Sequence, residues 1–116
     1  MTFWERYTRS KYINQKIEGK LKNIMQRLTD EEIALKLANL NGWEVGERGL
    51  VRKFDFLTFR EALEFVNRVG SIADNLDHHP DIEFGWGYAS IRFITHDVGG
   101  VTERDFLAAE EVNKIQ

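Results

Sequence analysis

The clearest hydrophobic pattern in the chain predicts a long helix that ends near Leu76. Apolar side chains recur there at steps of three and four residues, which places them along one face of a helix of about five turns. Thr58 and Glu61 have the spacing of a capping box, so the helix should begin between them. The apolar face is expected to contain Phe59, Ala62, Leu63, Val66, Val69, Ile72, Ala73 and Leu76.

Two more capping boxes predict a helix on either side of the long one. Thr29 with Glu32 predicts a helix that runs to about Asn39 and stops near Asn41-Gly42, with apolar contacts from Ile33, Leu35, Leu37, Ala38 and Leu40. Thr102 with Asp105 predicts a helix from about Glu103 to Ile115, which should bury Phe106, Leu107, Ala109, Val112 and Ile115.

A further helix is predicted nearer the start of the chain, from about Lys11 to Arg27. Gly19 lies in its interior and lowers its helix propensity. Its apolar positions are Ile13, Ile17, Leu21, Ile24 and Met25.

Two stretches between the helices have the alternation of β-strands. Residues 43–56 are typical of a hairpin with Gly46-Glu47-Arg48-Gly49 at its turn. Further along, apolar residues fall on even positions over 82–88 and on odd positions over 91–93. Because a shift of one residue exchanges the two faces of a strand, the chain should turn or bulge near Ala89. This stretch is predicted to form either two short strands or one kinked strand.

The order of these elements favours a single α+β domain. Helices separated by hairpin-like strands predict an antiparallel sheet of about four strands with helices packed on one face. At 116 residues the chain has single-domain length. The extra N-terminal helical segment lies outside this plan, so we divide the chain into an extension over residues 1–28 and a domain over residues 29–116.

Composition excludes several kinds of site. The chain has no cysteine, which excludes disulfides, thiolate zinc sites and a cysteine nucleophile, and which suits a cytoplasmic location. No apolar run approaches the roughly 18 residues needed to cross a bilayer, and the first residues lack the apolar core of a signal peptide. We therefore expect a cytoplasmic protein with no membrane partner.

Charge is distributed unevenly along the chain. Residues 1–28 hold seven Lys and Arg against two Glu, a net charge of +5, so the total of −3 leaves −8 on the remainder. A basic segment with aromatic residues can bind nucleic acid or an anionic membrane, but it is more often a solvated helix face or an arm on an acidic body. Because nothing else resembles a nucleic-acid-binding module, no nucleic-acid partner is expected.

All three histidines lie within nineteen residues of one another. His78 and His79 precede Pro80 between the long helix and the next predicted strand, and His96 follows the last predicted strand. Imidazole is the side chain that most readily exchanges a proton near neutral pH, so this grouping suits proton transfer. A bend between the two strands would be needed to bring His96 back toward His78 or His79.

Three kinds of chemistry compete for these residues. A nucleophilic triad is disfavoured, because neither Ser71 nor Ser90 lies in a nucleophile-elbow sequence. General acid–base catalysis needs only imidazoles and a carboxylate around a pocket. A metal site is the third kind; four carboxylates lie nearby, at Asp74, Asp77, Asp81 and Asp97, but the spacings His-x-x-x-His and His-x-Glu are absent. The alternative to all three is a structural role, with the histidines hydrogen-bonded to backbone or water.

The spacing of these residues resembles the signature of the pterin-4a-carbinolamine dehydratases. Asp74 precedes His78-His79-Pro80, an aromatic Trp86 follows, His96 comes after nine further residues, and Asp105 after eight more. The resemblance covers about residues 29–116 and includes Gly42-Trp43, the run from Phe54 to Ala62, Thr95-His96-Asp97 and Gly100-x-Thr102-x-x-Asp105.

The resemblance implies both a fold and an activity. The fold is a four-stranded antiparallel sheet with helices on one side, assembled as homodimers or homotetramers. The activity removes water from a 4a-hydroxytetrahydropterin and gives the quinonoid dihydropterin, which a reductase can recycle after an aromatic amino acid hydroxylase has acted. A proton must reach the leaving oxygen and another must leave a ring nitrogen, so imidazoles on either side of the pterin suffice. No cofactor or metal is implied, since the pterin is the substrate.

The same resemblance suggests roles for individual residues. His78 and His96 are the candidate acid and base, and His79 is the candidate for contacting and orienting the pterin. Asp105 resembles the acidic site residue of the family, although helix capping alone would also explain it. The other candidates for substrate binding are Asp74, Trp43, Trp86 and Thr95; Trp43 could instead fill the core, and Asp74 could be a partner that supports an imidazole or a solvated helix residue.

A second function comes from a different class. Proteins of this family can act as binding partners that hold another protein's oligomeric state, in transcription or in enzyme assembly, without using the pocket. An intact set of histidines favours the enzyme. The basic segment over residues 1–28 keeps a protein partner possible, because an added helix could mask or create an interface.

Overall fold

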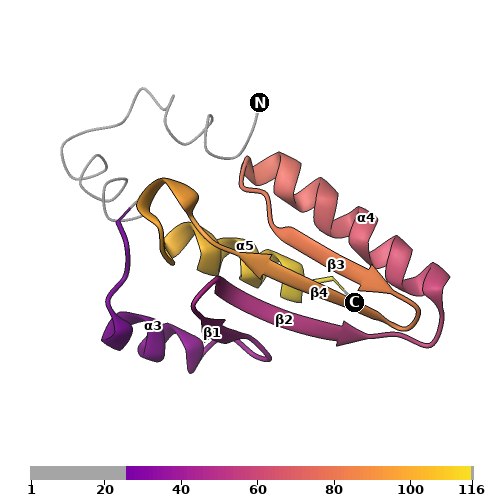
Figure 1. The fold of residues 1–116 in the computed structure, drawn as a ribbon, viewed down its shortest axis with the longest axis horizontal. Coiled ribbons are helices and arrows are strands. Elements are labelled where there is room, and N and C mark those ends of the chain that lie inside the picture. The colour runs from indigo at the N-terminus through magenta and orange to yellow at the C-terminus, as the bar shows by residue number, and fades with distance from the viewer. Residues whose placement is uncertain (1–25, 116) are drawn as a thin grey trace.

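The computed structural model describes residues 26–115 (Figure 1). Its elements are α3 (Asp30–Leu37), β1 (Glu44–Gly46), β2 (Gly49–Asp55), α4 (Phe59–Leu76), β3 (Asp81–Gly85), β4 (Tyr88–Phe93), the short 3₁₀ helix η1 (His96–Val98) and α5 (Glu103–Asn113). Within this range no helix combines the length and apolar character needed to span a bilayer. The helix predicted over about residues 11–27, and nearly all of the 1–28 extension, lie outside the described residues.

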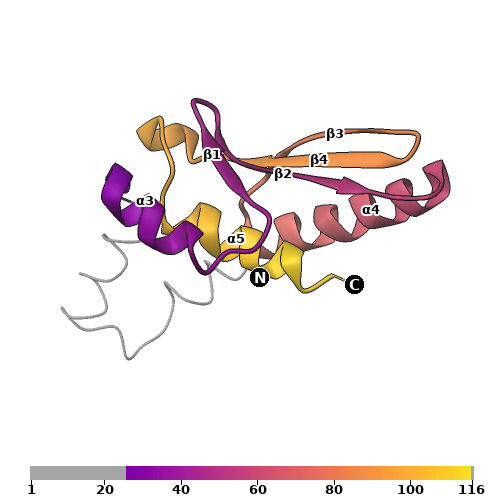
Figure 2. The ribbon, with the colours of Figure 1, turned by 90° about the horizontal axis from the view of Figure 1, so that it is seen from below.

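The four strands form one antiparallel sheet in the order β1-β2-β4-β3. Helices α4 and α5 lie along one face of this sheet (Figure 2), which confirms the predicted α+β architecture. Asp81 at the start of β3 pairs with Arg92 near the end of β4. The segment that enters β3 and the segment that leaves β4 therefore lie at the same end of the sheet.

The core fills the space between the sheet and the helices α4 and α5. Four of the eight residues of the predicted apolar face of α4 are buried and two more are half-buried, and Phe65, which the pattern omitted, is buried with them. Phe59 and Leu63 depart from the prediction, with 44% and 38% of their surfaces exposed. The fully buried side chains that join the layers include Leu50, Ile91, Phe93, Val69, Phe106 and Val112.

The predicted helix starts are confirmed, with one difference in detail. Thr29 and Thr102 each form a capping box with the acidic residue three positions later. Thr58 also accepts from the amide of Glu61, but the Glu61 carboxylate accepts from the amide of Leu57 rather than returning to Thr58. At its other end, α3 stops at Leu37, two residues before the predicted end.

The change of alternation near Ala89 corresponds to a hairpin between two separate strands. Gly85 pairs with Tyr88, so only Trp86 and Gly87 form the loop, and Gly87 has a φ of +79° that suits glycine. The turn thus lies just before the position where the pattern changes. It supplies the bend needed to return the chain to the histidine end of the sheet.

Gly49 opens β2 at a place where the chain passes very close to the end of β4. Its φ is +112°, and a Cβ atom built there would lie 2.2 Å from the carbonyl oxygen of Phe93. Both facts require glycine, because a side chain would be strained in conformation and would overlap backbone that cannot move aside cheaply.

We expect Gly49→Ala to lower the free energy of unfolding by about 2 kcal/mol or more. Gly46 is its partner in the β1–β2 hairpin, and a Cβ atom added at Gly46 would meet no heavy atom within 4 Å. Gly46→Ala is therefore the matched control and should change stability little. Urea unfolding of the two variants beside the wild type measures the difference. Equal midpoints for the two variants would contradict this explanation of Gly49.

Candidate active site

His78 leaves the end of α4 through a tightly defined turn. Asp77 ends the helix in the left-handed conformation, with φ 52° and ψ 42°. The amide of His78 then donates to the carbonyl of Ala73 at 3.1 Å, which closes the last turn of the helix. This turn directs the His78 side chain inward, where only 7% of its surface is exposed.

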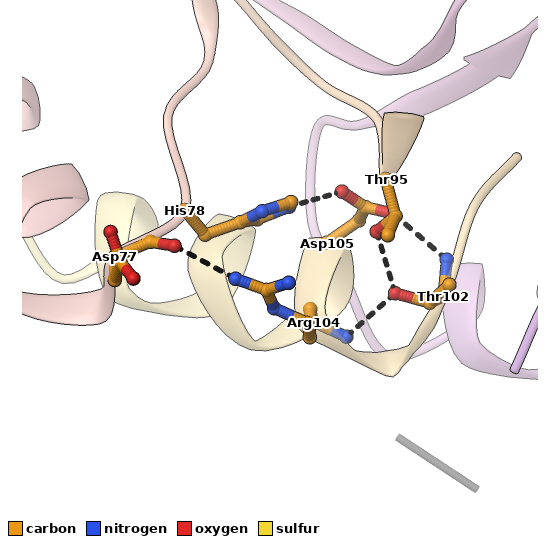
Figure 3. Close-up of polar contacts among 6 residues, drawn as sticks. All are labelled: Asp77, His78, Thr95, Thr102, Arg104 and Asp105. Atoms are coloured by element: carbon orange, nitrogen blue, oxygen red, sulfur yellow. Dashed lines mark hydrogen bonds and ion pairs between the residues drawn. The ribbon is translucent and has the colours of Figure 1, made fainter. Parts of the chain in front are cut away.

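The buried imidazole of His78 meets the buried carboxylate of Asp105 (Figure 3). His78 Nε2 lies 2.6 Å from Asp105 Oδ1, and Asp105 has no exposed surface. The ring of His78 also stacks on Phe93 of β4, with centroids 5.8 Å apart. Segments from α4, β4 and α5 therefore fix one imidazole.

The second carboxylate oxygen of Asp105 is held by two threonines. Oδ2 accepts from the Thr95 hydroxyl at 2.9 Å and from the Thr102 amide at 2.8 Å. The Thr102 bond is the capping interaction of α5. Asp105 therefore caps the helix with one oxygen and contacts His78 with the other, so the two explanations considered for this residue are both part of one arrangement.

The hydroxyl groups around Asp105 have a defined direction of hydrogen bonding. Thr95 uses its proton on Asp105, so in the 2.7 Å contact between the two hydroxyls Thr102 must donate to Thr95. The Thr102 oxygen in turn accepts from the amide of Arg104 at 3.2 Å. Both threonines are buried, and this chain of donors runs from the Arg104 amide through Thr102 and Thr95 to the Asp105 carboxylate.

This arrangement determines which nitrogen of His78 carries a proton. An ionised carboxylate can only accept, and Asp105 already accepts from a hydroxyl and an amide, so His78 Nε2 must donate. In a neutral imidazole the other nitrogen, Nδ1, is then an acceptor. In neutral His78 the nitrogen that can accept a proton is therefore Nδ1.

The other two histidines lie at the same end of the sheet but are exposed. His79 Nε2 is 2.9 Å from Asp74 Oδ1, and 59% of the His79 side chain and 81% of the Asp74 side chain are exposed. His96 begins η1 directly after Thr95 and is also exposed. The structure therefore brings Asp105, His78 and Thr95 into contact, with the His79–Asp74 pair and His96 nearer to solvent.

The two tryptophans proposed for substrate binding lie elsewhere. Trp43 is 5% exposed, packs on Phe93 with ring centroids 6.0 Å apart, and donates its indole N–H to Asn113 at 2.8 Å. It is a core residue, and both it and His78 pack on Phe93. Trp86 is 73% exposed in the β3–β4 turn, at the end of the sheet away from His78.

Thr95 was also a candidate for contact with substrate, but its surroundings indicate an indirect role. It is 2% exposed and its hydroxyl is engaged by Asp105 and Thr102. Sequence reasoning overlooked Thr102 as a member of the site, although its capping box with Asp105 was visible. It also overlooked Phe93 and Arg104, for which the sequence offered no comparable signal.

The arrangement of these side chains is suited to proton transfer. Within residues 26–115 no three His, Asp or Glu side chains are arranged to hold a metal ion. In the same range no serine takes part in the hydrogen bonds of His78 and Asp105. What the geometry provides is one oriented imidazole backed by a buried carboxylate, with two further imidazoles near the surface.

Comparison with known proteins gives a consistent result. The family model described as pterin 4 alpha carbinolamine dehydratase matches residues 26–115. A Rubrobacter xylanophilus protein named provisionally as a pterin-4-alpha-carbinolamine dehydratase is 51% identical over 89 residues, which cover 76% of this chain and 83% of that protein. A Sulfolobus acidocaldarius protein with the same provisional name is 40% identical over 90 residues, covering 78% and 99%.

A solved structure agrees with the sequence comparisons. The crystal structure of a transcriptional coactivator/pterin dehydratase from Brucella melitensis has a TM-score of 0.72 and 33% sequence identity to this chain. The match covers 76% of this chain and 96% of that one. Fold, signature residues and sequence identity all lead to the same conclusion, that this chain belongs to the pterin 4 alpha carbinolamine dehydratase family.

Proposed function

We propose that this protein dehydrates 4a-hydroxytetrahydropterins to quinonoid dihydropterins and so supports the recycling of a tetrahydrobiopterin-type cofactor. The observation that carries the proposal is the buried His78–Asp105 pair, with Nε2 and Oδ1 2.6 Å apart. Burial of an imidazole costs free energy unless it is hydrogen-bonded, and Asp105 supplies that bond at Nε2, which leaves Nδ1 for another role. Family membership supplies the class of substrate.

The reaction requires one proton to be delivered and one to be removed. The bond between C4a and the hydroxyl oxygen breaks as that oxygen gains a proton and leaves as water, and a ring nitrogen loses its proton as the double bond forms. His78 Nδ1 is the proposed base, because Nε2 is committed to Asp105. His96 in its protonated form is the proposed acid, and His79, paired with Asp74, orients the pterin. Pterin is the substrate, and the mechanism uses no cofactor.

We expect His78→Ala and His96→Ala each to lower kcat by about 10²-fold or more, since each removes a proton-transfer group. The assay follows the ultraviolet absorbance of 4a-hydroxytetrahydropterin, against the spontaneous rate. Wild-type protein that is folded and yet gives no acceleration would refute the dehydratase proposal. Full activity in His78→Ala would refute the assignment of the base.

Asp105→Asn tests the carboxylate with almost no change of shape. The amide has one acceptor oxygen and one donor group, so one of the three donors around Asp105 would face another donor. We expect a kcat loss of about 10²-fold and a stability loss of about 2 kcal/mol. Glu103→Gln, on the same turn of α5 but paired with Lys36, is the control and should retain the wild-type rate. A wild-type rate in Asp105→Asn would contradict its role.

A protein-binding role is the second candidate. An exposed apolar patch favours an interface with another protein chain. The patch consists of Leu57, Phe59, Leu63 and Trp86, and Leu57 and Trp86 have 85% and 73% of their surfaces exposed. The Phe56 amide donates to the Gly87 carbonyl, and Phe59 stacks on Phe84, so the four residues gather at one end of the molecule. Apolar groups grouped in this way are typical of an interface. The proposed occupant is a second copy of this chain, in a cytoplasmic homodimer or homotetramer.

We expect the double substitution Leu57→Lys and Leu63→Lys to shift sedimentation toward the monomer, because it places charge in the interface. Leu35→Lys is the matched control, since Leu35 is 73% exposed on α3, outside the patch. A wild-type protein that sediments as a monomer would refute self-assembly. It would leave the patch to the binding role that the coactivator name of the Brucella melitensis protein suggests.

A further inference from the structure

We propose that Arg104 is a positioning residue, which fixes the peptide group before His78 and thereby the direction of the His78 ring. The inference rests on the proposed function in one respect, namely that His78 is the base. It concerns a residue that binds the backbone before His78 and, in the proposed mechanism, does not contact the reacting atoms.

The contact that carries the inference joins α5 to the turn after α4. Arg104 Nη2 donates to the carbonyl oxygen of Asp77 at 2.8 Å (Figure 3). That carbonyl belongs to the peptide bond between Asp77 and His78. The bond is charge-assisted, and the planar guanidinium that donates it loses less rotamer freedom per hydrogen bond than a lysine would.

The backbone at this peptide needs such support. Asp77 is the one non-glycine residue with a positive φ in the described part of the chain. L-residues adopt this conformation at a cost, and it persists where the surrounding structure holds it. The C-terminal hydrogen bonds of α4 hold the amide side of the turn, and Arg104 holds the carbonyl side.

Two neighbouring residues of α5 therefore hold His78 from two directions. Asp105 binds the ring at Nε2, and Arg104 binds the carbonyl that precedes the residue. The backbone amide of Arg104 also donates to Thr102, within the network that reaches Asp105. With the ring fixed at one nitrogen and the backbone fixed on the other side, the direction of Nδ1 is determined.

The test measures the ring and the reaction separately. Arg104→Ala, Arg104→Lys and wild type are labelled with ¹⁵N-histidine, and the ring nitrogens of His78 are observed by NMR, while kcat and KM are measured by the dehydration assay. We expect wild type to show one tautomer with the proton on Nε2. Arg104→Ala should show loss or broadening of that signal and a kcat reduced by about tenfold, with KM changed less than about twofold, as expected for misplacement of a proton-transfer group.

Arg104→Lys keeps a charged donor and should recover part of both losses, which a purely structural role would not predict for the ring signal. It also keeps the test decisive if Arg104→Ala does not fold. Glu103→Ala is the matched control, because it removes the adjacent charged side chain of α5, which pairs with Lys36 rather than with Asp77.

The possible outcomes separate this inference from the dehydratase proposal. Wild-type ring signals and kcat in folded Arg104→Ala would overturn the inference, as would equal losses in Glu103→Ala. If wild type does not accelerate dehydration, the proposed function fails, and the ring signals of the Arg104 variants alone decide whether Arg104 positions His78.

Discussion

A carboxylate with no exposure to water must be matched by hydrogen-bond donors, and Asp105 imposes that requirement on this fold. Removal of a charge from water costs several kcal/mol unless donors replace the lost hydration. The three donors come from the turn after α4, the segment after β4 and the first turn of α5. The three segments that meet at this end of the sheet therefore share one electrostatic role, which is to supply hydrogen-bond donors to Asp105.

The same requirement explains why the adjacent histidines have different environments. His78 satisfies Asp105 and is buried, whereas His79 pairs with Asp74 in solvent. Exposed ion pairs contribute little to stability and are screened by salt. The buried His78–Asp105 pair instead fixes the orientation of the imidazole. Two residues that are neighbours in the sequence thus differ in constraint, with the His78 ring held in a buried pair and the His79 ring in a solvent-exposed one.

Much of the fold was predictable because its signals are local. The capping boxes and apolar spacing located the three helices that the structure describes, and the change of alternation near Ala89 located the β3–β4 hairpin. Errors arose where tertiary contacts decide the outcome. Nothing in the spacing of α4 indicates that Phe65 would be buried and Leu63 exposed, because that depends on how the helix is rotated against the sheet. The end of α3 differed by two residues because the amides of Asn39 and Leu40 bond to carbonyls three residues earlier rather than four.

The candidate site, like the fold, was predictable from the sequence only in part. The sequence identified His78, Asp105 and Thr95, which do lie together. It did not show that the Thr95 hydroxyl is buried and donates to Asp105 instead of facing a ligand, because no sequence pattern reports burial of a single hydroxyl. Because Asp105 both caps α5 and holds His78, the first turn of that helix cannot fray without releasing the imidazole. Helix ends are ordinarily the least protected parts of a fold, but here local unfolding of a terminus and loss of the oriented imidazole are the same event, so the His78–Asp105 pair is either assembled together with its helix or not at all.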